Sequence, residues 1–439
     1  MDIKDIAKIT NGRLINPEQP QKIEKFIIDS RKAQKETFFV PLKGENTDGH
    51  NFIQNALENG SVGYFSEKEV SFPNGILVDN TLDALTKVGK YKRNNLQKAV
   101  GITGTAGKTT TKELLKLVLS QFFKTYGTEG NYNNHIGLPL TLSNIPENTE
   151  IGVFELGANK KGDISELVNI LEPDITVLTT VGDAHNEGFG TFKDIVEAKG
   201  EIFDTGEFAV LPEFFLPYYE SKLINYITFG TESDADIQIS DVKITDIGIK
   251  GTIKYKKEKI ILEIPTFNKA IFHNIGAVAG VLYALGLDPL KPLKILEDFK
   301  EIEGRFKTIN KGNLTIIDDT YNSNPLSLKN LIDVLNAFKE KKVIVIGDML
   351  ELGQHSEKLH REIGQYLLSS NIDKIYLYGD EVKFIKDVIG NKKDLKHFSS
   401  KEELSKNLLK ELKNEKAVIG IKGSRGMKME DVVNHLLNA

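Results

Sequence analysis

The sequence predicts an α/β protein built from about three domains. The chain has 439 residues, and domains commonly hold about 150. Hydrophobic residues make up 40% of the sequence, enough for several sizeable cores. Short apolar runs alternate with helical patterns in two series, one in the middle of the chain and one beginning near residue 314. This alternation favours parallel sheets covered by helices on both faces.

The first series begins with a buried strand over residues 99–103. A glycine-rich turn follows it, and a helix is expected over 110–123. Further strands are expected at 151–156 and 175–180, each beside glycine or proline. Residues 236–264, in which Ile, Val and Lys alternate, resemble an antiparallel insertion. The apolar face of the helix is expected to contain Leu114, Leu115, Val118 and Phe122.

The second series indicates a separate doubly wound, Rossmann-like domain. The first 80 residues look different, with a short strand at 37–40 and a helix near 52–59. Domain boundaries are expected near residues 80–97 and 297–312. The strands of the second series are predicted at 314–317, 343–346, 374–378 and 417–421. The predicted domains are therefore residues 1–85, 86–303 and 304–439.

Composition excludes several classes of protein. The chain has no cysteine, so disulfides, thiolate metal sites and a cysteine nucleophile are excluded, and any metal must bind to oxygen or imidazole. A net charge of −5 argues against a nucleic-acid partner. No apolar run is long enough to span a membrane, and the N-terminus lacks the apolar core of a signal peptide. We therefore expect a cytoplasmic protein.

The strongest local motif is a shortened phosphate loop, G-x-x-G-K-T, between the first strand and its helix. Glycines allow backbone N–H groups to turn toward phosphate oxygens, and the helix N-terminus adds a positive field. Lys108 can neutralise phosphate charge, and the Thr109 hydroxyl can bind Mg²⁺. Ile102 stands where the usual first glycine would be, and the alternative is an ordinary turn with a solvated lysine. The loop comprises Gly104, Thr105, Ala106, Gly107, Lys108, Thr109 and Thr110.

Three other positions, Glu155, His185 and Asp319, carry groups suited to a site at the carboxyl edge of the sheets. Glu155 ends a predicted strand, and His185 follows the strand that ends near Val181. Asp319 is the second of two acids that close the strand at 314–317. Each of these, like Lys199 on a predicted helix, could instead be an ordinary surface or turn residue. A phosphate loop alone leaves switches, motors, kinases and ligases open.

Taken in order, these segments resemble the Mur ligase family, ATP-dependent amide ligases that build the peptide of bacterial cell-wall precursors. The resemblance covers nearly the whole chain. The segments most similar to the members that add a dipeptide are DDTYNSNPLSL at 318–328, VIGDMLELGQHSEKLHREIG at 345–364 and KGSRGMKME at 422–430. DSRKAQKETFFVPLKGENTDGH at 29–50 resembles the family's N-terminal uridine-nucleotide domain. Other matching segments are TGTAGKTTTKE at 103–113, NYNNHIGLPLTL at 131–142, FELGANKKGDI at 154–164, VGDAHNEGFG at 181–190, AKGEIF at 198–203, HNIGAVAG at 273–280 and GRF at 304–306.

The resemblance implies an N-terminal domain that holds a UDP group, a central ATPase and a C-terminal domain that closes over the site. It implies a catalytic role for Lys108, His185 and Lys199, with Lys199 carbamylated. The implied Mg²⁺ ligands are Thr109, Glu155, His185 and Lys199. The implied ATP contacts outside the loop are Asn274, Arg305 and Asp319. The residues expected to contact the other substrates are Ser30, Arg31, Asp48, His50, Asn134, Tyr321 and Asn322.

The activity implied is the addition of D-Ala-D-Ala to a UDP-N-acetylmuramoyl-tripeptide through an acyl phosphate, with ATP and Mg²⁺, by a monomer. One alternative is a Mur-type or folylpolyglutamate-type ligase that adds a single amino acid. Another is a phosphate-loop switch without ligase activity. Two residues depart from the pattern: Ala106 replaces the common asparagine, and His135 stands where an acidic residue is usual.

Overall fold

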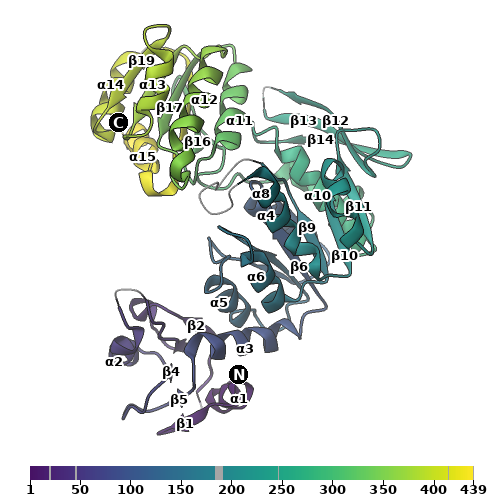
Figure 1. Cartoon of the computed structure of the whole chain (residues 1–439), viewed down its shortest axis with the longest axis vertical. Helices are drawn as coiled ribbons and strands as arrows, with labels where there is room; N and C mark the ends of the chain where they lie inside the picture. Colours follow the sequence, from purple (N-terminus) through teal and green to yellow (C-terminus); the bar gives the residue numbers. More distant parts are fainter. Residues whose placement is uncertain (19–20, 45–46, 183–190, 246, 414, 439) are drawn as a thin grey trace.

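The computed structural model of the chain describes residues 1–18, 21–44, 47–182, 191–245, 247–413 and 415–438. Three separate β-sheets follow one another along the molecule, and the two termini lie toward opposite ends (Figure 1). The sheets contain five, nine and six strands in chain order. This arrangement confirms the predicted α/β class. In the described part of the chain, no helix is both long and apolar enough to cross a membrane.

The N-terminal sheet has the order β1-β5-β4-β3-β2, with β1 antiparallel and the others parallel. Phe26, Phe38 and Phe65 form its core together with Ile6 and Leu85 from two helices. The strands are Arg13–Ile15 (β1), Lys25–Ile27 (β2), Thr37–Phe39 (β3), Gly63–Ser66 (β4) and Gly75–Leu77 (β5). The helices are Ile3–Thr10 (α1), Ile53–Glu58 (α2) and Thr81–Arg93 (α3), with short 3₁₀ turns at Ser30–Lys32 (η1) and Gly49–Phe52 (η2).

An asparagine side chain joins this sheet to the central part of the molecule. Asn144 directly follows helix α5 (Gly137–Ser143). Its Oδ1 accepts from the Phe26 backbone N–H at 2.7 Å, and its Nδ2 donates to the Phe26 carbonyl at 3.0 Å. The amide therefore pairs with edge strand β2 as another strand would. Helix α3 also packs along α5, and this packing likewise holds the N-terminal sheet in place.

The central sheet has the order β14-β13-β12-β11-β10-β9-β6-β8-β7. It is parallel from β7 to β12, and β13 and β14 are added antiparallel. The predicted antiparallel segment is therefore confirmed, and it extends the main sheet. The strands are Lys98–Thr103 (β6), Thr125–Gly127 (β7), Ile151–Glu155 (β8), Ile175–Leu178 (β9), Phe208–Pro212 (β10), Tyr226–Gly230 (β11), Ile237–Ile244 (β12), Ile249–Tyr255 (β13) and Glu258–Ile264 (β14).

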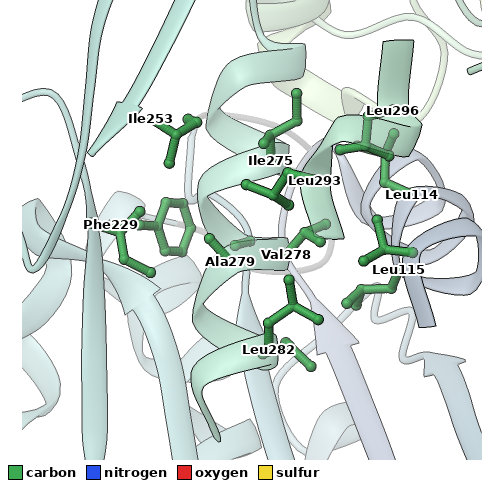
Figure 2. Close-up of a cluster of buried hydrophobic side chains, with 14 of the residues drawn as sticks. Leu114, Leu115, Phe229, Ile253, Ile275, Val278, Ala279, Leu282, Leu293 and Leu296 are labelled. Atoms are coloured by element: carbon green, nitrogen blue, oxygen red, sulfur yellow. The ribbon is translucent and has the colours of Figure 1, made fainter. Parts of the chain in front are cut away.

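Helix α10 (Ile271–Ala284) organises the core on one face of this sheet. Its Ile275, Val278 and Leu282 are fully buried. In Figure 2 these side chains lie between leucines of α4 (Lys108–Leu119) and side chains of the strands. This packing fixes the helix that follows the phosphate loop. The other helices of the region are Asp163–Leu171 (α6), Phe192–Gly200 (α8) and Leu216–Tyr219 (α9), with 3₁₀ segments at Glu201–Asp204 (η3), Glu213–Phe215 (η4), Glu220–Lys222 (η5) and Lys291–Asp298 (η6).

The C-terminal sheet has the order β15-β16-β20-β17-β18-β19, parallel except for β15. The four predicted strands are confirmed, and β15 and β19 add one strand at each edge. The strands are Lys307–Lys311 (β15), Leu314–Asp319 (β16), Lys341–Gly347 (β17), Lys374–Tyr378 (β18), Asp394–Phe398 (β19) and Ala417–Lys422 (β20). The helices are Pro325–Asn336 (α11), Ser356–Leu368 (α12), Lys383–Ile389 (α13), Lys401–Leu412 (α14) and Glu430–Asn438 (α15), with 3₁₀ turns at Gly353–His355 (η7) and Arg425–Met427 (η8).

Candidate active site

The predicted phosphate loop connects β6 to the N-terminus of α4. Gly104 and Gly107 both have positive φ, 149° and 84°. A Cβ on Gly104 would lie 2.0 Å from Thr179 Oγ1, and one on Gly107 would lie 2.5 Å from Asn274 Oδ1. Side chains would therefore clash at both positions, and glycine lets the backbone turn there. The contact also places the predicted residue Asn274 directly against the loop.

Lys108 is the first residue of helix α4. Its Nζ donates to the Gly104 carbonyl at 2.6 Å, which folds the side chain back over the loop. Burial lowers the pKa of Lys108 to about 8; Glu155 opposes this shift, and Arg305 adds to it. A buried lysine that lacks a full counter-charge is suited to bind an anion.

Glu155 ends β8 beside the loop, as predicted, and is almost completely buried. Its Oε2 accepts from the Thr109 hydroxyl at 3.1 Å. Its Oε1 lies 3.3 Å from Lys112 Nζ and forms no hydrogen bond with any described residue. Two of the four predicted Mg²⁺ ligands, Thr109 and Glu155, are thus in direct contact.

Lys199 lies on α8 with only 2% of its surface exposed. Burial, assisted by the charge of Lys108 and opposed by Asp163 and Glu201, lowers the pKa of Lys199 to about 7. The lysine is therefore close to the phosphate loop, although it is absent from the described lining of the cavity. His185 falls in residues 183–190, outside the described residues.

The C-terminal domain contributes a second group of residues. The Arg305 guanidinium stacks on the Tyr321 ring, 4.0 Å from its centre. Asp319 forms a buried ion pair with Lys422 at 2.5 Å. Burial raises the pKa of Asp319 to about 6, although Lys422 and Arg305 oppose that shift. Lys422 also donates to the Asn322 carbonyl at 2.8 Å and so fixes the turn after β16.

One cavity of about 1140 Å³ brings the central and C-terminal groups together. This volume is large enough for a nucleotide with a second substrate. The predicted residues that line it are Thr105, Ala106, Gly107, Lys108, Thr109, Thr110, Asn134, Glu155, Asn274, Arg305, Asp319, Tyr321 and Asn322. His135, which like Ala106 departs from the family pattern, also lines this cavity.

The predicted N-terminal residues Ser30, Arg31, Asp48 and His50 are not among the described residues that line this cavity. Arg31 is largely exposed and contacts Asp29 at 2.8 Å, and Ser30 is buried in the same turn. His50 is buried, with Nδ1 2.6 Å from Asp48 Oδ1. Its Nε2 accepts from the Glu67 backbone N–H at 3.2 Å, so Nδ1 carries the proton. The imidazole therefore connects the Asp48 side chain to the backbone of Glu67.

Two buried lysines of the site were not predicted as functional residues. Lys422 lies in KGSRG, a segment that only the family resemblance pointed out. Lys112 lies in the segment after the phosphate loop. Lys112 is one helical turn beyond Lys108, so the two share a face of α4. This spacing is the signal that could have identified Lys112.

The comparisons with known proteins agree with this geometry. The profile "Mur ligase middle domain" matches residues 102–282, and "Mur ligase, glutamate ligase domain" matches residues 304–425. The chain belongs to the Mur ligase family. The phosphate loop and Glu155 fall in the first match of this Mur ligase, and Arg305 and Asp319 fall in the second.

Two curated relatives of this Mur ligase are named UDP-N-acetylmuramoyl-tripeptide–D-alanyl-D-alanine ligase. The Bacillus subtilis relative is 35% identical and the alignment covers 100% of this chain and 98% of the relative. The Escherichia coli relative is 30% identical, with 99% and 98% covered.

Two solved structures are also similar along nearly their whole length. MurF from Acinetobacter baumannii has a TM-score of 0.90 at 28% identity and covers 100% of this chain and 98% of its own. MurF from Thermotoga maritima, solved in complex with ADP, has a TM-score of 0.85 at 32% identity, with 94% and 97% covered.

Proposed function

We propose that this Mur ligase joins D-alanyl-D-alanine to UDP-N-acetylmuramoyl-tripeptide and converts ATP to ADP and phosphate. The observation that carries the proposal is the shared cavity. Lys108 of the central domain and Arg305 of the C-terminal domain both line it, and the charge of Arg305 acts on Lys108. A simple nucleotide switch needs no second domain at the phosphate loop. The names of the full-length relatives supply the substrates of the proposal.

ATP would bind with its phosphates on the loop. Lys108 supplies positive charge, and the helix N-terminus supplies backbone N–H groups. Asn274, in contact with Gly107, would bind the adenine end, while Arg305 and Asp319 approach from the other domain. The T. maritima relative was solved in complex with ADP, which supports binding of an adenine nucleotide by this chain.

Mg²⁺ fits beside the loop at Thr109 and Glu155. The carboxylate is buried with incomplete hydrogen bonding, and carboxylate and hydroxyl oxygens are ligands that Mg²⁺ prefers. Within the described residues, no group of three His, Asp or Glu side chains could hold a metal. Phosphate oxygens and water would complete the shell, as is usual for Mg²⁺. The bound cation would neutralise charge on the phosphates.

A second Mg²⁺ site is proposed at Lys199 and His185. A lysine must lose its proton before it can react with CO₂, and burial lowers the pKa of Lys199 to about 7. The resulting carbamate would give this part of the site the negative oxygen ligands that a hard cation prefers.

The reaction follows from this arrangement. The tripeptide carboxylate would attack the γ-phosphate of ATP to form an acyl phosphate, while Lys108 and Arg305 neutralise charge on the transferring group. The free amine of D-Ala-D-Ala would then attack the acyl carbon, and phosphate would leave. Enclosure between the two domains would protect the acyl phosphate from water.

The remaining predicted residues would bind the UDP-muramyl peptide. Ser30, Arg31, Asp48 and His50 would hold the uridine-nucleotide part in the domain proposed at residues 1–85. Asn134, Tyr321 and Asn322 would contact the peptide end inside the cavity, where the proposed domains 86–303 and 304–439 meet. The enzyme would act as a monomer in the cytoplasm.

The direct test is to identify the product. The protein is incubated with ATP, Mg²⁺, a UDP-muramyl-tripeptide and D-Ala-D-Ala, and the UDP-linked product is analysed by mass spectrometry. A mass increase equal to D-Ala-D-Ala minus water is expected. A panel in which D-Ala-D-Ala is replaced by single amino acids, with glutamate among them, tests the alternative ligases. Addition of a single amino acid in preference to the dipeptide would contradict the proposal.

A further inference from the structure

Lys112 is a fully buried lysine whose position the proposed chemistry does not explain. It lies on α4 one turn after Lys108, with 2% of its surface exposed. A buried ammonium group is costly unless charged and hydrogen-bonding partners surround it. Its surroundings therefore indicate what it does.

Among the described residues, three oxygen atoms surround the ammonium group of Lys112. Its Nζ donates to the Thr128 carbonyl at 2.6 Å, and it lies 2.8 Å from Glu113 Oε1 and 3.3 Å from Glu155 Oε1. Thr128 also holds Glu155, because its Oγ1 accepts from the Glu155 backbone N–H at 3.0 Å. The lysine and the glutamate are thus attached to the same residue of the turn after β7.

The two oxygens of Glu155 consequently have different surroundings. Oε2 accepts from the Thr109 hydroxyl at 3.1 Å, on the side of the phosphate loop. Oε1 faces the Lys112 ammonium and is buried without a hydrogen bond to a described residue. A divalent cation bound to Oε1 would lie very close to a fixed positive charge, whereas one bound to Oε2 would not.

We propose that Lys112 is a positioning residue that restricts Glu155 to binding a cation through Oε2 alone, beside Thr109. Mg²⁺ has six ligands in strict octahedral geometry, whereas Ca²⁺ readily takes both oxygens of one carboxylate. Blocking Oε1 therefore favours Mg²⁺ over Ca²⁺. The inference rests on the proposed function, because it requires a cation at Glu155.

The test measures binding of ADP to the full-length protein by calorimetry, with increasing MgCl₂ or CaCl₂. In the wild-type protein, Mg²⁺ should strengthen ADP binding more than Ca²⁺ at equal concentration. Lys112→Met should weaken the effect of Mg²⁺ by about 10- to 100-fold, the usual result of removing a residue that orients a metal ligand. The effect of Ca²⁺ should fall less, so that the preference for Mg²⁺ decreases.

Two further variants keep the result interpretable. Lys116 lies on the same helix and pairs with Glu113, but it is not in contact with Glu155. The Lys116→Met variant should therefore show the same Mg²⁺ preference as the wild type. Lys112→Gln keeps an N–H donor but loses the charge, so it serves if the methionine variant does not fold. It should show the same loss of Mg²⁺ preference.

The outcomes separate this inference from the proposed function. If Mg²⁺ has no effect on ADP binding to the wild-type protein, the proposed metal site and this inference both fail. If Mg²⁺ and Ca²⁺ act equally on the wild type, or a folded Lys112 variant keeps the wild-type preference, the inference alone is overturned. The wild-type titrations need no variant, so they test the inference even if neither substitution is tolerated.

Discussion

The guanidinium group of Arg305 lies close enough to Lys108 for its charge to contribute to the lowered pKa of that lysine. Arg305 follows a turn at Gly304, where φ is 69°, and it is held by stacking on Tyr321. Lys108 belongs to the phosphate loop of the central domain. Two cations from different domains thus face one cavity, and they would repel each other unless an anion lay between them.

Replacement of Lys108 by alanine should remove most of the charge that acts on the transferred phosphoryl group. Loss of one such group commonly costs about 100- to 1000-fold in turnover, so ADP release should be nearly abolished. Circular dichroism would verify folding. Lys116→Ala, on the outer part of the same helix, is the matched control and should retain activity. Near-normal turnover of the Lys108 variant would refute the assigned role.

Lys199→Ala should be inactive, and acetate or formate should restore part of the activity by supplying a carboxylate. Lys193→Ala, which removes an exposed lysine from the same helix, should stay active without rescue. Mass spectrometry of the intact protein at high bicarbonate should show one added CO₂. The pKa of Lys199 near 7 predicts that carbamylation increases as pH rises through this value. A fully active enzyme with unmodified Lys199 would contradict the carbamate.

Asp319 should make stability depend on pH between about 4 and 6. Burial raises its pKa in the folded protein to about 6, above the usual value of about 3.8. The folded state therefore binds the proton more tightly, and the contribution of Asp319 to stability falls as pH rises through this window. Compared with Asp319→Asn, the wild type should lose free energy of unfolding from pH 4 to 6 and change little above. Urea unfolding of both proteins checks this, and a parallel pH dependence would argue against the shift.

Arg31→Ala should weaken binding of the UDP-muramyl substrate and leave ATP binding unchanged. Arg31 is largely exposed in the N-terminal domain, away from the phosphate loop. A hydrogen bond to a charged group contributes about 1.5–3 kcal/mol, which predicts a rise in KM of about tenfold or more. Lys35→Ala, an exposed lysine nearby, is the control. Equal effects on the KM for ATP and for the UDP substrate would contradict the assignment.

Asn144→Ala tests the attachment of the N-terminal sheet. The substitution removes both hydrogen bonds to Phe26 and leaves the backbone groups of an edge strand unpaired. A loss of about 1–3 kcal/mol in the free energy of unfolding is expected. Gln97→Ala, which breaks an exposed side-chain contact to Glu150, should have a much smaller effect. Equal stabilities of the two variants would show that the asparagine contributes little.

The sequence predicted the buried parallel strands well, because continuous apolar runs between turn residues leave few alternatives. The strand at 374–378 has the predicted bounds. Edge strands β15 and β19 were missed, since their exposed positions carry polar residues such as Asn310 and Asp394. Phe122 was wrongly placed on the buried face of a helix. That helix ends at Leu119, so Phe122 is 48% exposed.

The site was predictable where a motif carries its own chemistry. The phosphate loop and Glu155 follow from their positions at strand ends, and the structure brings them into contact. Contacts between distant parts of the chain were not predictable from spacing. The pairing of Lys422 with Asp319 depends on β16 and β20 lying side by side in the sheet. The role of Lys112 depends on its contact with Thr128, and sequence patterns do not place these two residues side by side.

The most direct test of the account is the substrate dependence of phosphate release from ATP. Phosphate is measured with the wild-type protein, ATP and Mg²⁺, in the presence of the UDP-muramyl-tripeptide, D-Ala-D-Ala, both or neither. Sustained release that requires both substrates, in amounts equal to the ligated product, is the predicted result. Release at the same rate without either substrate would indicate a nucleotide switch and contradict the account.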